Sequence, residues 1–106
     1  MQFDMQNMLS QVKRLQQEME KKQGEVKTQV ITADAGGGMV VVTMTGAGKV
    51  TGVKIDPLLL ANNDVQMLED LVVAAVNKAK DNVDKLLEEA MGGISSMLPN
   101  IPGMNL

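Results

Sequence analysis

Near the N-terminus, apolar residues recur at intervals of three and four positions and are separated mainly by Gln, Lys, Arg and Glu. They are Met5, Met8, Val12, Leu15 and Met19. This spacing places one narrow apolar seam along a helix, as in a heptad repeat. The segment "KKQGE", around Gly24, supplies the cations and the glycine that are typical of a helix end. The pattern predicts an amphipathic helix over residues 5–23.

Between residues 25 and 55 the apolar period changes to two, which is typical of strands. Val26, Thr28, Val30 and Thr32 would then share one side of a first strand. The glycine-rich segments "DAGGG" and "GAGK" follow as turns, and they bound a second strand over 39–45 and a third over 49–55. Three short strands joined by such turns predict an antiparallel meander.

The predicted middle strand is apolar on both sides. Val40, Val42 and Met44 lie on one side, whereas Met39 and Val41 lie on the other. A strand with one face in water would instead alternate with polar residues, so both faces need cover. Two helices can readily cover one face, and a second copy of the chain is the most economical cover for the other. We therefore expect a homodimer with these five residues at its interface.

The second half of the chain predicts helices. Asp56 and Pro57 fit a helix start, and "LLL" after them predicts a short apolar turn. Asn63 and Gln66 have the spacing of a capping box, and a broad apolar stripe over 65–91 predicts a long helix that is the main cover of the sheet. The expected fold class is α+β, with one domain over residues 1–91. Residues 92–106, which contain two prolines and no periodic pattern, are expected to form a flexible tail.

Composition narrows the function. The 106 residues are 44% hydrophobic, with 10 Met and a single Phe, which predicts one modest, adaptable core. Cys and His are absent, so disulfides, the commonest metal ligands and the commonest catalytic bases are absent too. We expect neither an enzyme nor a cofactor or metal site. The sequence shows no signal-peptide pattern and no apolar run of membrane-spanning length, so we expect a cytoplasmic protein.

The stretch "TMTGAGKVTGVKIDP" superficially suggests a phosphate-binding loop. A P-loop requires a glycine at position 43, Ser or Thr at position 50, and a helix after the lysine. Thr43 and Val50 occupy those positions, and Lys49 opens a predicted strand. "GAGK" is therefore interpreted as a hairpin turn. The acidic residues Asp56, Asp64, Glu69 and Asp70, which could suggest a carboxylate or Mg²⁺ site, lie at helix starts, where capping and the helix dipole account for them.

Cations on the two predicted long helices are the remaining candidates for a site. They are Lys13, Arg14, Lys21 and Lys22 off the seam of the first helix, and Lys78, Lys80 and Lys85 on or beside the exposed side of the last. These residues could contact phosphates. Acidic partners at helical spacing (Arg14 with Glu18, Lys80 with Asp84, Lys85 with Glu89) and a formal net charge of -3 favour instead a solvated, salt-bridged surface. The near absence of aromatic residues argues against single-strand binding.

The order of elements resembles the YbaB/EbfC family of bacterial nucleoid-associated proteins. The likeness rests on "MLSQVKRLQQEMEK", on "GGGMVVVTMTGAGKVTGVKIDPLLL" and on "DVQMLEDLVVAAVNKAKDNV", and it covers nearly the whole chain. The resemblance implies a homodimer whose paired helices project like the arms of tweezers. It also implies binding to duplex DNA in the nucleoid, altered DNA conformation and an effect on gene expression.

Under this resemblance, the seven cations become the expected DNA contacts. We expect phosphate contacts, strong salt dependence and little sequence preference. The alternative hypothesis is a dimeric adaptor that binds another protein through the methionine-rich seam or through the C-terminal tail.

Overall fold

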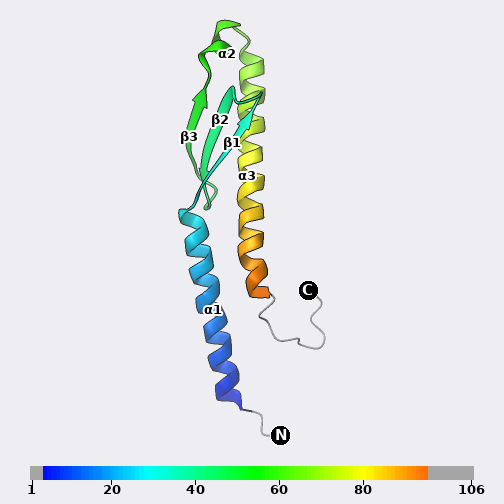
Figure 1. Cartoon of the computed structure of the whole chain (residues 1–106). Coiled ribbons are helices and arrows are strands. Elements are labelled where there is room, and N and C mark those ends of the chain that lie inside the picture. The colour runs from blue at the N-terminus through cyan, green and yellow to red at the C-terminus, as the bar shows by residue number, and fades with distance from the viewer. Residues whose placement is uncertain (1–3, 96–106) are drawn as a thin grey trace.

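The structure, a computed structural model, describes residues 4–95, with side chains described as far as residue 92. Its elements are α1 (Met5–Thr28), β1 (Val30–Ala35), β2 (Val40–Thr45), β3 (Val50–Ile55), α2 (Pro57–Ala61) and α3 (Val65–Ser95). The predicted α+β class is confirmed. Along the chain, one long helix precedes the three-stranded antiparallel sheet and another long helix follows it. The molecule is elongated, measuring 75 × 25 × 15 Å along its principal axes. Figure 1 shows α1 continuing away from the sheet and α3 running alongside both.

The first helix is longer than predicted. It passes through Gly24 and ends at Thr28, so Val26 and Thr28 are helical and the expected start of the first strand was wrong. The reason is packing, because Val26 continues the three-and-four spacing of the apolar seam and is only 3% exposed. Gln29 then takes an extended conformation, and its N–H donates to the carbonyl of Val26 at 3.1 Å.

The sheet has the order β1-β2-β3, and both pairs are antiparallel. The predicted meander is therefore confirmed. Gly36, Gly37 and Gly38 all adopt positive φ in the first turn, a conformation that is costly for residues with a Cβ. The pairing of β2 with β3 shifts between Thr43 and Met44, which marks a bulge near the second turn.

The core lies between the sheet and α3. Val40 and Val42 are fully buried in β2, and they belong to one buried cluster with Ala75 and Ala79 of α3, which are also fully buried. The two alanines let the helix backbone approach the strands closely, so a small chain can exclude water from this layer. Leu59 of α2, 1% exposed, belongs to the same cluster. The prediction that the long helix is the main cover of the sheet is confirmed, and α3 contacts β1 and β2.

This packing bears on the five residues expected at a dimer interface. Val40, Val42 and Met44 are at most 2% exposed within a single protomer, because α3 already covers their side of β2. Within one protomer they therefore have almost no surface to offer a partner. Of the five residues expected at the interface, only Met39 and Val41 keep exposed surface, and both are half-buried.

Aspartate side chains cap α1, α2 and α3. The Asp56 carboxylate accepts from the N–H of Leu58 at 2.9 Å, and the Asp64 carboxylate accepts from the N–H of Met67 at 3.0 Å. Asp4 caps α1 in the same way. The predicted capping box at Asn63 was wrong, because Asn63 lies one residue before the cap with a φ of 51°.

The last helix, α3, is also longer than predicted. It was expected to end at Met91 but continues to Ser95, so the first residues of the expected tail are helical. Residues 96–106 lie outside the described part of the chain. Within residues 4–95, no helix combines the length and the apolar character that a membrane crossing requires.

Candidate nucleic-acid interface

The N-terminal half of α1 is a projecting arm. Figure 1 shows α1 continuing past the end of α3, so this half lacks the neighbour that the C-terminal half has. Between Met5 and Gln17 the only charged residues are Lys13 and Arg14. The arm is therefore locally positive, although the chain as a whole carries a net charge of -3.

Polar side chains follow the arm on the side opposite to the apolar seam. Ser10, Arg14, Gln17 and Lys21 are spaced four, three and four residues apart and are all exposed. At 3.6 residues per turn, this spacing aligns them along one face of the helix. We call these four residues the polar stripe. Its two cations were expected from the sequence, whereas Ser10 and Gln17 were missed, although they show the same helical spacing as the seam.

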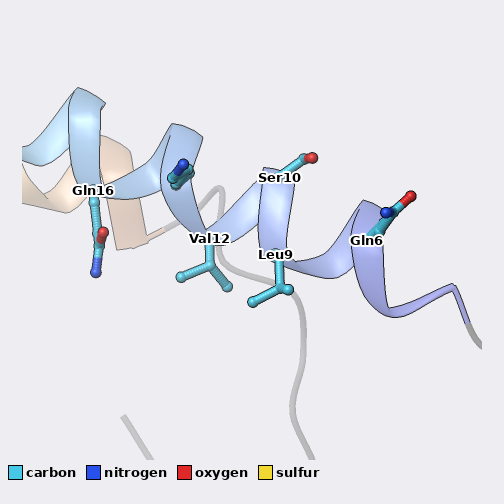
Figure 2. A pocket seen from close by; sticks show the side chains of 6 residues that line it. Gln6, Leu9, Ser10, Val12 and Gln16 are labelled. Carbon is cyan, nitrogen blue, oxygen red and sulfur yellow. The ribbon is translucent and has the colours of Figure 1, made fainter.

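Figure 2 shows the two sides of the arm at close range. Leu9, Val12 and Gln16 project from one side of α1, and Ser10 and Gln6 project from other sides of the helix. Lys13 helps to line the open surface region that these residues border. It follows Val12 directly, so it lies at the margin between the seam and the polar side. An extended lysine there can reach a ligand bound to the polar stripe.

Lys22 is placed differently from the sequence prediction. It was expected to lie off the apolar seam, but it continues the seam spacing after Met19 and is half-buried, as is Leu15 one heptad before it. Val26, on the same side of α1, is buried. Lys22 is therefore the least accessible of the four cations expected on this helix.

Two lysines of α3 are engaged with carboxylates. The Nζ of Lys80 lies 2.6 Å from Oδ1 of Asp84, which confirms that expected pair. The Nζ of Lys78 lies 3.7 Å from Oδ1 of Asp34 on β1 and also donates to its backbone carbonyl at 3.4 Å. Across residues 4–92 these two are the only ion pairs within 4.0 Å, so the expected pairs of Arg14 with Glu18 and of Lys85 with Glu89 do not form.

The C-terminal half of α3 is acidic. Lys85 is its only cation after Lys80, and it shares residues 81–89 with four carboxylates, those of Asp81, Asp84, Glu88 and Glu89. A polyanion would be repelled by this helix unless its acidic side chains face away. Of the seven expected residues, Lys13, Arg14 and Lys21 on α1 are thus exposed and, within residues 4–92, have no carboxylate within 4.0 Å.

The arm can bind anions but offers little for chemistry on them. Lys and Arg donate strong hydrogen bonds to phosphate oxygens, and exposed Ser and Gln can add neutral ones. Within the described residues, no group of three or more acidic side chains is arranged to hold a metal ion. Phe3, the only aromatic residue, lies outside the described part. The arrangement suits contacts to a phosphate backbone better than stacking on bases.

Fold and surface together define a small α+β protein with a basic helical arm that suits a polyanionic partner. The chain belongs to the YbaB/EbfC DNA-binding family, which it matches over residues 1–98. It is 40% identical over 103 residues to a nucleoid-associated protein of Brucella ovis, with 97% of this chain and 96% of the relative covered. A nucleoid-associated protein of Agrobacterium fabrum is 42% identical over the same length and coverage.

A solved structure has the same fold. The crystal structure of an uncharacterized protein from Helicobacter pylori superposes with a TM-score of 0.71 at 23% sequence identity. The match covers 92% of this chain and 100% of that protein. The arrangement of helices and strands is therefore shared at low sequence similarity.

Proposed function

We propose that this protein is a nucleoid-associated protein that binds duplex DNA through its phosphate backbone, mainly with α1. The observation that carries the proposal is the polar stripe along α1, a helix that contains no acidic residue between Met5 and Gln17 and whose N-terminal half projects as an arm. Membership of a DNA-binding family and the names of the relatives support it. We also propose the nucleoid, within the cytoplasm, as its location.

The contacts are electrostatic and independent of sequence. Lys13, Arg14 and Lys21 neutralise phosphates, and Ser10 and Gln17 donate hydrogen bonds between them. Each neutralised phosphate releases condensed counterions, so affinity falls steeply with salt, with a slope of about -0.9 per phosphate on a log-log plot. Because the cations are few and the net charge is negative, we expect modest affinity.

The lysines of α3 and Lys22 contribute less to DNA binding than the cations of the polar stripe and Lys13. Lys78 and Lys80 must exchange a carboxylate partner for a phosphate, which reduces their net contribution. Lys85 can contact DNA only if the neighbouring acidic side chains point away, and Lys22 must extend from its half-buried position.

A homodimer would present two such arms to one duplex. α3 packs mainly on β1 and β2. β3 forms an edge of the sheet, and although Ile55 at its end packs against the core, Val50 and Val53 are each 44% exposed. An uncovered edge strand with exposed apolar residues is a natural site for pairing with a second copy. We propose that the partner pairs along the edge strand β3. Met39 and Val41 lie on the face of the sheet opposite to Val53 and are further candidates if the partner also covers that face. Two arms on one duplex can change its conformation, and a change in gene expression would follow from that.

The polar stripe can be tested by neutralising it. Replacing Arg14 and Lys21 by Gln removes two positive charges, and in a dimer four. We expect the log-log salt slope to fall by about 0.9 for each phosphate that is no longer neutralised, and the affinity at low salt to fall at least tenfold. Fluorescence anisotropy of labelled duplexes of unrelated sequence, titrated at several salt concentrations, measures both quantities.

The matched control removes the same number of positive charges from α3 instead of α1. Lys78→Gln with Lys80→Gln also removes two positive charges per chain, but from residues that are paired with carboxylates. We expect a smaller decrease in affinity and little change in slope. Equal decreases in the two variants would show that net charge, not the arm, determines binding, and would overturn the assignment to α1.

A further inference from the structure

The apolar seam of α1 is left without a neighbour along the arm. Met5 is 66% exposed, Met8 50%, Leu9 63% and Val12 48%. Met5, Met8 and Val12 belong to the seam and Leu9 lies beside it; we call these four residues together the free seam. Further along the same helix Leu15 is half-buried and Val26 is buried. The difference arises because α1 extends past the end of α3 (Figure 1).

The chain leaves α3 close to the point where the seam loses its cover. α3 packs beside α1 and runs in the opposite direction, so its C-terminal end at Ser95 lies alongside α1 (Figure 1). The sequence continues for at least 11 residues, "SMLPNIPGMNL", with no charged side chain. Five of these residues are large and apolar: Met97, Leu98, Ile101, Met104 and Leu106.

The length of this segment fits the free seam. Eleven extended residues reach about 36 Å at about 3.3 Å per residue. The free seam from Met5 to Val12 spans about 10 Å, at about 1.5 Å per residue of helix. Proline fixes its own φ and disfavours helix at the residue before it, so Pro99 and Pro102 lower the conformational entropy that the segment loses when it is ordered. The segment is therefore long enough to return to the seam and to run along it.

We propose that residues 96–106 dock on the free seam of the same protomer. The contact buries two apolar surfaces that would otherwise both face water, and it needs no charged partner, since neither surface carries a charge. Because the free seam is short, the contact is weak and depends on the covalent tether, which gives a millimolar effective concentration for a short flexible linker. The polar stripe lies on the opposite side of α1, so docking leaves Ser10, Arg14, Gln17 and Lys21 accessible, whereas Lys13 lies at the edge of the docking surface.

The absence of cysteine allows a direct test in the full chain. Asn105→Cys provides a single attachment point for a nitroxide spin label, and the methionine methyl groups are labelled with ¹³C for NMR. We expect strong paramagnetic broadening of the Met5 and Met8 methyl signals. Met67, at the N-terminal end of α3 and 40% exposed, serves as the distant reference and stays sharp.

Two further samples distinguish this contact from its alternatives. Leu9→Gln removes an apolar side chain from the free seam, and we expect it to reduce the broadening to less than half. Ser10→Gln, on the polar stripe, is its matched control and leaves the broadening unchanged. Both positions are exposed and both replacements favour helix, so neither variant should unfold the chain.

A mixed sample tests which copy supplies the segment. Spin-labelled chains without ¹³C are combined with ¹³C-labelled chains that carry no spin label. Docking within one protomer predicts no broadening in this mixture. Broadening there equal to that in the doubly labelled chain would overturn the proposal in favour of a second copy, and sharp Met5 and Met8 signals in every sample would overturn docking altogether.

Discussion

Gly46 fixes the point where α1 meets the sheet. It follows β2, and its N–H donates to the carbonyl of Gln29 at 2.9 Å, just after α1 ends. A Cβ at this position would overlap the backbone carbonyl of Val26 in the last turn of α1. The absence of a side chain therefore allows the second hairpin turn to lie directly against the base of the arm.

Gly46→Ala should destabilise the protein by about 1–3 kcal/mol, the usual cost of forcing extra atoms into a packed site. The obstacle is backbone, so it cannot move aside as a flexible side chain would. Gly24→Ala is the matched control, since a Cβ there meets nothing within 4 Å inside the helix, and we expect it to stabilise by about 0.5–1 kcal/mol. Urea denaturation measures both changes. If Gly46→Ala left the free energy of unfolding unchanged, the junction between the turn and α1 would be adaptable, and Gly46 would not determine where α1 lies.

At the scale of elements, α3 has a different role in each half. Its first half carries Ala75 and Ala79 against the sheet, and its second half runs beside α1. The start of this helix is therefore tied to the core, and anything that frays the start also loosens the layer over β2. Asp64 holds that start through its hydrogen bond to the N–H of Met67.

Asp64→Ala should lower the free energy of unfolding by about 1 kcal/mol, because the N–H of Met67 loses its acceptor. Asp64→Asn retains an oxygen that can cap the helix and should be close to the wild type. Thermal unfolding followed by circular dichroism compares the two. If Asp64→Asn lowered the stability as much as Asp64→Ala, the charge of Asp64, and not its capping hydrogen bond, would be the stabilising feature.

At the scale of the whole molecule, the protomer places its core and its arm at opposite ends (Figure 1). α3 packs mainly on β1 and β2, and β3 is the edge strand on the other side of β2 from β1. A partner at β3 would bury the exposed valines and would leave α1 free to contact DNA. The proposed dimer and the proposed DNA contact therefore use separate surfaces.

This separation predicts that Val53→Asp weakens the dimer, because a carboxylate would then be buried in an apolar contact. Light scattering of the Val53→Asp variant should give a mass near the 11.4 kDa of one chain, and the wild type should give twice that mass. Val73→Asp is the control, because Val73 is 59% exposed on α3, away from the sheet. We expect this variant to remain dimeric. A wild-type protein that is monomeric, or two variants that behave alike, would rule out β3 as the interface.

The elements that the sequence predicted correctly depend on local forces. The seam from Met5 to Met19, the glycine turns between the strands, and Asp56 before Pro57 each act within a few residues. Helical spacing, permitted φ values and capping hydrogen bonds are properties of short segments. The order of elements, the meander and the long final helix could therefore be predicted from the sequence alone, as could Arg14 and Lys21 as exposed cations.

The tertiary structure decided what depends on distant parts of the chain. α1 passes Gly24 because burial of Val26 outweighs the local preference of a glycine to end the helix. Val40 and Val42 belong to the protomer's core because α3 covers their face and not the other. Lys78 is engaged by Asp34, 44 residues earlier, a contact that no spacing rule could predict. Side chains far apart in the sequence interact only after the fold brings them together, so only the fold shows which faces and which charges remain free.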